Sequence, residues 1–172
     1  WSCTKFYLNE KLQECGVDLA SVGGNVSLDD TELQSFITRH NTLCMFEGGV
    51  SPFKQPEDLM SFKGLFSNQV SYFHTRYFSK LGSVARLILL AGFLGAKEIK
   101  FVGFDGNPVK QKHAFEGEQK VHDEVWRNNS SLNVYRRQFA IFWDYVLSMD
   151  NGVLYTNLGK GHPNNLTTDI LE

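Results

Sequence analysis

Short apolar runs alternate along this chain with segments in which apolar residues recur at intervals of three and four. The short runs have the length of strands, and they lie at residues 17–25, 42–49, 70–75, 97–105 and 152–159. The periodic segments predict helices at residues 6–16, 27–41, 82–96 and 133–149. Strands that alternate with helices predict an α/β fold, with a mostly parallel sheet and helices on both of its faces.

The helix expected at residues 27–41 shows the pattern most clearly. Ser27 is a candidate N-cap, and the apolar stripe of this helix consists of Leu33, Phe36 and Ile37. By contrast, residues 50–69 hold two of the four prolines, so a break in the regular pattern is expected there.

The composition fits one hydrophobic core. With 172 residues, of which 42 % are hydrophobic, residues 1–172 are expected to form a single α/β domain. The sequence after Trp1 reads as the middle of a domain, so we expect a fragment of a longer protein whose first strand is missing.

Charge and cysteine content exclude several classes of function. A net charge of −2 gives no basic surface for nucleic acid or an anionic membrane. The longest apolar run, residues 84–96, contains Arg86 and is too short to span a bilayer. Cys3, Cys15 and Cys44 lack metal-ligand spacing, and we interpret them as reduced thiols of a cytoplasmic protein.

The ends of the expected strands are rich in glycine and asparagine. Ligands of open α/β sheets bind beyond the carboxyl ends of the strands, and small residues there allow the backbone to approach a ligand. The candidate segments are Gly23-Gly24-Asn25, Gly48-Gly49, Asp105-Gly106-Asn107 and Asn157-Leu158-Gly159. The alternative is that these are ordinary α/β loops, which favour the same residues.

Two positions point more specifically to a nucleotide. A helix that starts at Gly82-Ser83 would offer free N–H groups and a positive dipole end to a phosphate, unless Ser83 is only an N-cap. Asp105 at a strand end can accept from ribose hydroxyls or hold a divalent ion, unless it only closes an Asx-turn. Neither a Walker A motif nor a G-x-G-x-x-G motif is present, which argues against P-loop and conventional dinucleotide enzymes.

His113, His122 and His162 lie in polar segments that follow expected strands. Histidine is the best proton carrier near neutral pH, so each is a candidate acid or base, although a surface histidine is more often simply solvated.

Residues 82–116 resemble a group of Rossmann-like transferases. This group contains the bacterial CMP-sialic-acid-dependent sialyltransferases of the Campylobacter type. It also contains the motility accessory factor family, whose archaeal members are 6-hydroxymethylpterin pyrophosphokinases. The resemblance rests on Gly82-Ser83-Val84, Gly103-Phe104-Asp105 and His113-Ala114-Phe115-Glu116, which match the helix start, strand end and polar loop of the group.

The resemblance implies a nucleotide-dependent transferase with a Rossmann-like fold that transfers a glycosyl group from a nucleotide-sugar in surface glycan synthesis. It implies a CMP-type donor, no metal, and a glycan or small-molecule acceptor. The donor would be lined by Gly24, Asn25, Gly82, Ser83, Asp105 and Asn107. His122, or alternatively His113, would act as the catalytic base.

The sequence departs from the sialyltransferases at the donor phosphate. Asn107 and His113 occupy the places of two tyrosines that hold this phosphate in the family. Two alternatives therefore stay open: a pterin diphosphokinase-like enzyme that uses ATP and Mg²⁺, or a non-catalytic α/β binding module. An oligomer is possible through aromatic residues of 142–145, whose alternative use is a buried helix face.

Overall fold

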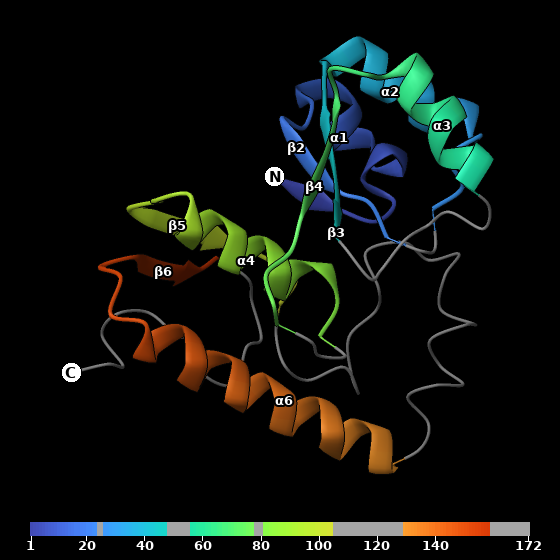
Figure 1. Cartoon of the computed structure of the whole chain (residues 1–172). Coiled ribbons are helices and arrows are strands. Elements are labelled where there is room, and N and C mark those ends of the chain that lie inside the picture. The colour runs from blue at the N-terminus through green and yellow to red at the C-terminus, as the bar shows by residue number, and fades with distance from the viewer. Residues whose placement is uncertain (24–25, 48–55, 78–80, 105–128, 159–172) are drawn as a thin grey trace. The chain divides into compact units, whose positions relative to one another are not determined.

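The computed structural model describes residues 1–23, 26–47, 56–77, 81–104 and 129–158 (Figure 1). The chain divides into two compact units, Trp1–Tyr77 and Phe78–Glu172, which we call the first and the second unit and describe separately. That residues 1–172 form a single domain stays a prediction.

The first unit contains a parallel sheet of four strands in the order β1-β2-β3-β4. The strands are β1 Ser2–Cys3, β2 Leu19–Ser21, β3 Leu43–Glu47 and β4 Val70–Phe73. Ala20 of β2 pairs with Cys44 of β3, and Cys44 pairs in turn with Val70 of β4. The sheet confirms the predicted α/β fold and the strands expected within residues 17–25, 42–49 and 70–75.

The helical segments of the first unit lie between these strands. They are η1 Phe6–Leu8, α1 Glu10–Cys15, α2 Thr31–His40 and α3 Pro56–Leu65. The expected break at residues 50–69 is therefore wrong for α3. Pro56 is the first residue of this helix, a position where the missing N–H of proline costs nothing.

The cap of α2 also differs from the expectation. Asp30, not Ser27, precedes the helix, and its carboxylate accepts a hydrogen bond from the N–H of Glu32 at 2.9 Å. Ser27 instead donates its hydroxyl to Asp29. The helix thus starts three residues later than Ser27 would place it, while Asn41 ends it in the left-handed conformation.

The core of the first unit lies on one face of its sheet. Ala20 and Cys44 contribute to it from paired strands, as do the predicted stripe of α2 and aromatic residues of η1 and α3. The ring of Phe6 meets that of Phe36 at 5.2 Å, and Phe46 meets Phe62 at 5.9 Å, both edge to face. Helices on the opposite face of this sheet stay a prediction.

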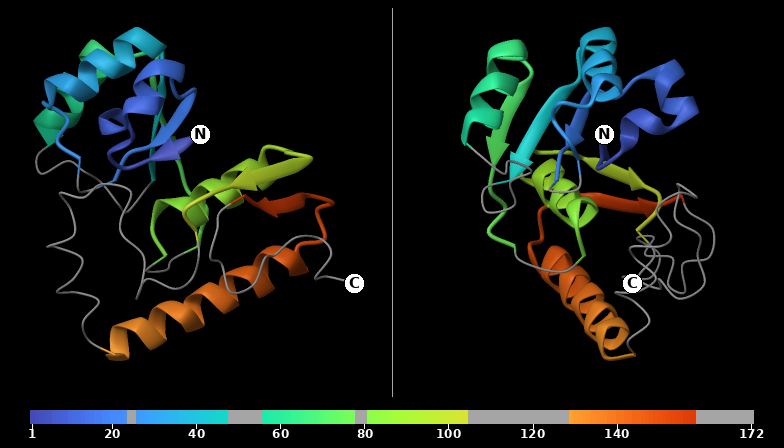
Figure 2. Two further views of the ribbon diagram at one scale, coloured as in Figure 1. Left: turned by 180° about the vertical axis from the view of Figure 1, so that it is seen from behind. Right: turned by 90° about the vertical axis from the view of Figure 1, so that its right-hand side faces the viewer.

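The second unit contains two parallel strands with helices. These elements are α4 Ser83–Phe93, β5 Glu98–Phe101, α6 Asn129–Ser148 and β6 Leu154–Asn157. β5 pairs with β6 so that Phe101 lies opposite Asn157. Both views of Figure 2 show α6 on one side of this strand pair.

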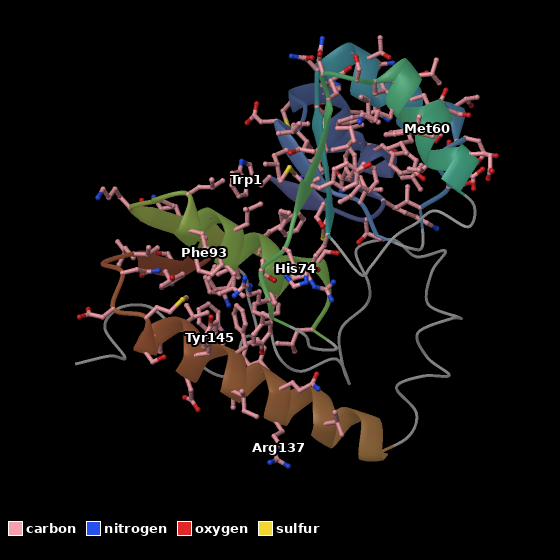
Figure 3. All side chains as sticks on the ribbon, viewed as in Figure 1. Trp1, Met60, His74, Phe93, Arg137 and Tyr145 are labelled. Atoms are coloured by element: carbon pink, nitrogen blue, oxygen red, sulfur yellow. The ribbon has the colours of Figure 1, made fainter. Side chains whose placement is uncertain are left out.

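Aromatic side chains of α6 join the two strands of the second unit. Trp143 stacks on Phe101 of β5 at 5.5 Å and meets Tyr155 of β6 edge to face at 5.7 Å. Phe142 and Trp143 are buried, which confirms for these two residues the alternative of a buried helix face. Tyr145 is exposed (Figure 3), and an oligomer stays a prediction. No helix in the described part of the chain is both long enough and apolar enough to cross a membrane.

Leu33→Ala is expected to lower the free energy of unfolding by about 2–5 kcal/mol, because it leaves a cavity in the core of the first unit. Leu65→Ala is the matched control, since Leu33 is 0 % and Leu65 66 % exposed in the same unit. Urea unfolding followed by circular dichroism measures both. Equal effects of the two substitutions would contradict the assigned core.

Cys44 makes stability depend on alkaline pH. Burial raises the pKa of its thiol from the ordinary 9.0 to about 12. The neutral thiol is therefore retained in the folded protein at a pH where the unfolded chain has lost this proton. The contribution of the neutral thiol to the free energy of unfolding is complete below pH 9.0 and is lost as the pH rises toward about 12. At about pH 10, the loss is about 1 kcal/mol.

The comparison that isolates this effect is the wild type against Cys44→Ala, with the free energy of unfolding measured from neutral to alkaline pH. The variant is expected to be less stable at neutral pH and to lose less stability on alkalisation. Parallel pH profiles for the two proteins would show that Cys44 is not the group responsible.

Candidate functional site

The N-terminus of α4 carries the two predicted site residues that the structure describes. Gly82 is the N-cap, with φ 76° and ψ −161°, and Ser83 is the first helical residue. As a glycine, Gly82 provides no side-chain cap for this end. Ser83 is therefore at the helix start, as predicted, but its alternative role as N-cap is wrong. The first-turn N–H groups can serve a ligand instead.

The carboxyl end of β5 lies at the same end of the second unit as this helix start. Residues 94–97 connect α4 to β5 in a short turn, and the N–H of Gly95 in this turn donates to the carbonyl of Gly92 in the last turn of α4 at 3.0 Å. A helix and a strand joined by so short a turn run antiparallel, as Figure 1 shows for α4 and β5. Gly82 therefore lies toward the exit of β5 rather than toward its start.

Phe104 holds the exit of β5 in place. Its side chain is only 2 % exposed and packs edge to face on Phe142 at 5.4 Å. Gly103, with φ 73°, turns the chain so that Phe104 enters this aromatic cluster. The residue that follows, Asp105, is thus attached directly to a fixed point of the core.

Asn157 adds a polar group at this end. It is the last residue of β6, lies opposite Phe101 and is 9 % exposed. The N–H of Leu158 continues the ladder by donating to the carbonyl of Phe101 at 2.8 Å. The amide of Asn157 can both donate and accept hydrogen bonds, which suits the hydroxyl groups of a sugar or ribose.

Most of the predicted site lies outside the described residues. This holds for the donor residues Gly24, Asn25, Asp105 and Asn107 and for the two candidate bases, His113 and His122. His162 lies outside them as well. Within one unit, the structure brings together the start of α4, the exit of β5 and the exit of β6.

Glu47 at the end of β3 was missed in the sequence. It is 7 % exposed and accepts a hydrogen bond from the Thr75 hydroxyl at 2.9 Å. The N–H of Arg76 donates to Nδ1 of His74 at 2.9 Å, which leaves the proton of a neutral ring on Nε2 (Figure 3). The sequence signal that could have identified Glu47 is an acidic residue at the end of an otherwise apolar strand.

The exits of β3 and β4 therefore form a second polar locus, in the first unit. The carboxylate of Glu47 is buried and the imidazole of His74 is exposed, and both groups can form hydrogen bonds with hydroxyl groups. Among the described residues, no group of three or more His, Cys, Asp and Glu side chains could hold a metal ion.

No protein-family model, curated protein or solved structure matches the chain. The features that bear on function are therefore the residues of the site and the resemblance of residues 82–116. Of these, the start of α4 and its position beside the exit of β5 are described in the structure.

Gly82→Ala is expected to lower the free energy of unfolding by about 1–3 kcal/mol. A Cβ there would meet no atom within 4 Å, so the cost comes from the backbone conformation, which only glycine adopts readily. Gly64→Ala is the control, because Gly64 also has open space but lies inside α3 with an ordinary φ.

The control substitution should stabilise the protein, by about 0.5–1 kcal/mol, since alanine favours a helix interior. Urea unfolding of the two variants and the wild type measures both changes. If Gly82→Ala were also stabilising, the conformation assigned to the start of α4 would be wrong.

Proposed function

We propose that the protein is a nucleotide-dependent transferase that moves a glycosyl group from a nucleotide-sugar to an acceptor in surface glycan synthesis. The observation that carries the proposal is the start of α4. The N-cap of this helix is Gly82, which provides no side-chain cap. The start of the helix lies at the same end of its unit as the carboxyl end of β5. Such a helix start is suited to the phosphate of a nucleotide.

The donor would lie across this end of the second unit. Its phosphate would accept from the first N–H groups of α4, where Gly82 has no side chain in the way. Asp105, which follows the anchored Phe104, would accept from the ribose hydroxyls, and Asn107 would lie beside it. Gly24 and Asn25 lie outside the described residues, and their part in donor binding stays a prediction from the sequence. Two parallel strands with α4 and α6 are compatible with the Rossmann-like arrangement that we propose.

His122 is the proposed base, with His113 as the alternative. In the reaction, the acceptor hydroxyl transfers its proton to the imidazole while its oxygen bonds to the anomeric carbon of the donor sugar. The bond between that carbon and the phosphate oxygen breaks, and the nucleotide leaves with the electron pair. The proposal requires no metal for a CMP-type donor and places the reaction in the cytoplasm.

A thermal-shift panel tests the proposal directly. CMP, CDP, UDP, GDP and ATP are each added with and without Mg²⁺. CMP without metal is expected to raise the melting temperature by several degrees, since a ligand at about one hundred times its Kd adds about 2.7 kcal/mol. Stabilisation only by ATP with Mg²⁺ would replace glycosyl transfer with diphosphate transfer of the pterin type. No shift with any nucleotide would overturn both and favour a non-catalytic binding module.

Ser83→Asp locates the bound nucleotide. A carboxylate in the first turn stabilises a helix by about 0.3–1 kcal/mol, but it repels a phosphate at the same place. We expect the variant to fold and to bind the nucleotide about tenfold more weakly. Thr38→Asp on the exposed side of α2 adds the same charge and should leave the nucleotide-induced shift unchanged. An equal loss in both variants would exclude the start of α4 as the phosphate site.

A further inference from the structure

A hollow of about 370 Å³ lies in the first unit, where η1 and α1 meet α2. Its volume is at the small end of the range of about 300–1,000 Å³ that is usual for small-molecule sites. Leu8, which is 40 % exposed, contributes apolar surface to its lining, whereas Tyr7 and Phe36 of the lining are buried. The hollow thus offers a space for a ligand of a few non-hydrogen atoms, away from the strand exits.

Opposite charges stand along the length of this hollow. Glu32 lies in the first turn of α2 and Arg39 in its last turn, so about 10 Å of helix axis separates the two. Ser35 lines the hollow between them. Because these residues are spaced by three and four positions, they share one face of the helix. One side of the hollow therefore presents a carboxylate, a hydroxyl and a guanidinium in that order.

A chain of hydrogen bonds fixes the opposite wall. Arg39 donates through Nη1 to Oε1 of Gln13 at 3.1 Å, and Nε2 of Gln13 donates to the backbone carbonyl of Tyr7. The hydroxyl of Tyr7 donates to Oδ2 of Asp30 at 2.8 Å. Asp30 caps α2, so the wall is attached to the same helix that carries the charges. A site held in this way loses little conformational freedom when a ligand binds.

The bond to Gln13 also orients Arg39. It occupies one of the five N–H donors of the guanidinium and draws the group toward α1 rather than toward Glu32. The charges of Arg39 and Glu32 are consequently not paired with each other. A ligand with one charge would satisfy one end of the hollow only, whereas a ligand with both charges would satisfy each end.

We propose that this hollow binds a small linear dipolar molecule, an amino acid whose ammonium and carboxylate are separated by several carbon atoms. The carboxylate lies at Arg39 and the ammonium at Glu32, while the carbon chain runs past Leu8. Ser35 offers a hydroxyl to either polar end. This proposal is independent of the nucleotide site, which lies in the other unit.

The test is a titration of the full ¹⁵N-labelled chain with 5-aminopentanoate, followed by amide chemical shifts. Pentanoate and pentylamine serve as singly charged comparators of the same length. We expect saturable shifts at residues of α1, η1 and α2, and a Kd for 5-aminopentanoate about fivefold lower than for either comparator. Absence of saturable shifts with 5-aminopentanoate, or equal affinity for all three compounds, would overturn the proposal.

Two charge-neutralising variants show whether the ends are used as assigned. Arg39→Gln should weaken 5-aminopentanoate and pentanoate about threefold and spare pentylamine, while Glu32→Gln should weaken 5-aminopentanoate and pentylamine and spare pentanoate. Lys11→Gln is the matched control, because Lys11 is an exposed charge on α1 outside the lining. Loss of affinity in the control equal to that in the two variants, or no loss in either variant, would also overturn the proposal.

Discussion

Parallel pairing of strands is the constraint on which the described structure depends. Each strand pair in the described ranges is parallel, and a tight turn cannot join parallel neighbours. The chain must return across the sheet after every strand, and η1, α1, α2 and α3 are the segments that do so in the first unit. The same constraint gathers the strand exits of each unit at one edge. Glu47 and Thr75 meet at one such edge, and the exits of β5 and β6 lie side by side at another.

Helix ends decide where the polar chemistry of each unit lies. In the first unit, one carboxylate does two tasks: Asp30 accepts from the N–H of Glu32 and from the hydroxyl of Tyr7. The N-terminus of α2 therefore already has a side-chain hydrogen-bond partner within the protein. The start of α4 has no comparable side chain among the described residues. Two helices of similar length thus differ in what they can bind, because one is capped from within and the other is not.

Periodicity predicted α2, α4, α6 and the strands β2 to β6, but neither β1 nor α3. The stripe of Leu33, Phe36 and Ile37 and the strand around Ala20 are local patterns, since each buried position follows from its neighbours in sequence. Prolines misled the interpretation of residues 50–69, because proline interrupts a helix interior but is accepted at a first turn, as Pro56 shows.

The site was predictable only where it depends on a local signal. The pair Gly82-Ser83 predicts a helix start from the sequence alone, and the structure has one there. Glu47 gave a weaker signal, because its burial depends on Thr75, which follows 28 residues later. The wall of the hollow in the first unit was not predictable for the same reason, since Arg39 and Gln13 are 26 residues apart.

The burial of Phe104 has a consequence for how this protein can change over evolution. Phe104 is the last described residue before residue 105, and its buried ring packs on Phe142 of α6. Substitutions up to Phe104 are filtered by packing, because cavities in such a cluster cost several kcal/mol. The ring partners of Phe104 are Phe101 of β5 and three residues of α6, Phe139, Phe142 and Trp143, so substitutions at residues 105–128 leave all of these side chains as they are. New ligand preferences can therefore arise by exchange of residues 105–128, with the residues of the aromatic cluster inherited unchanged.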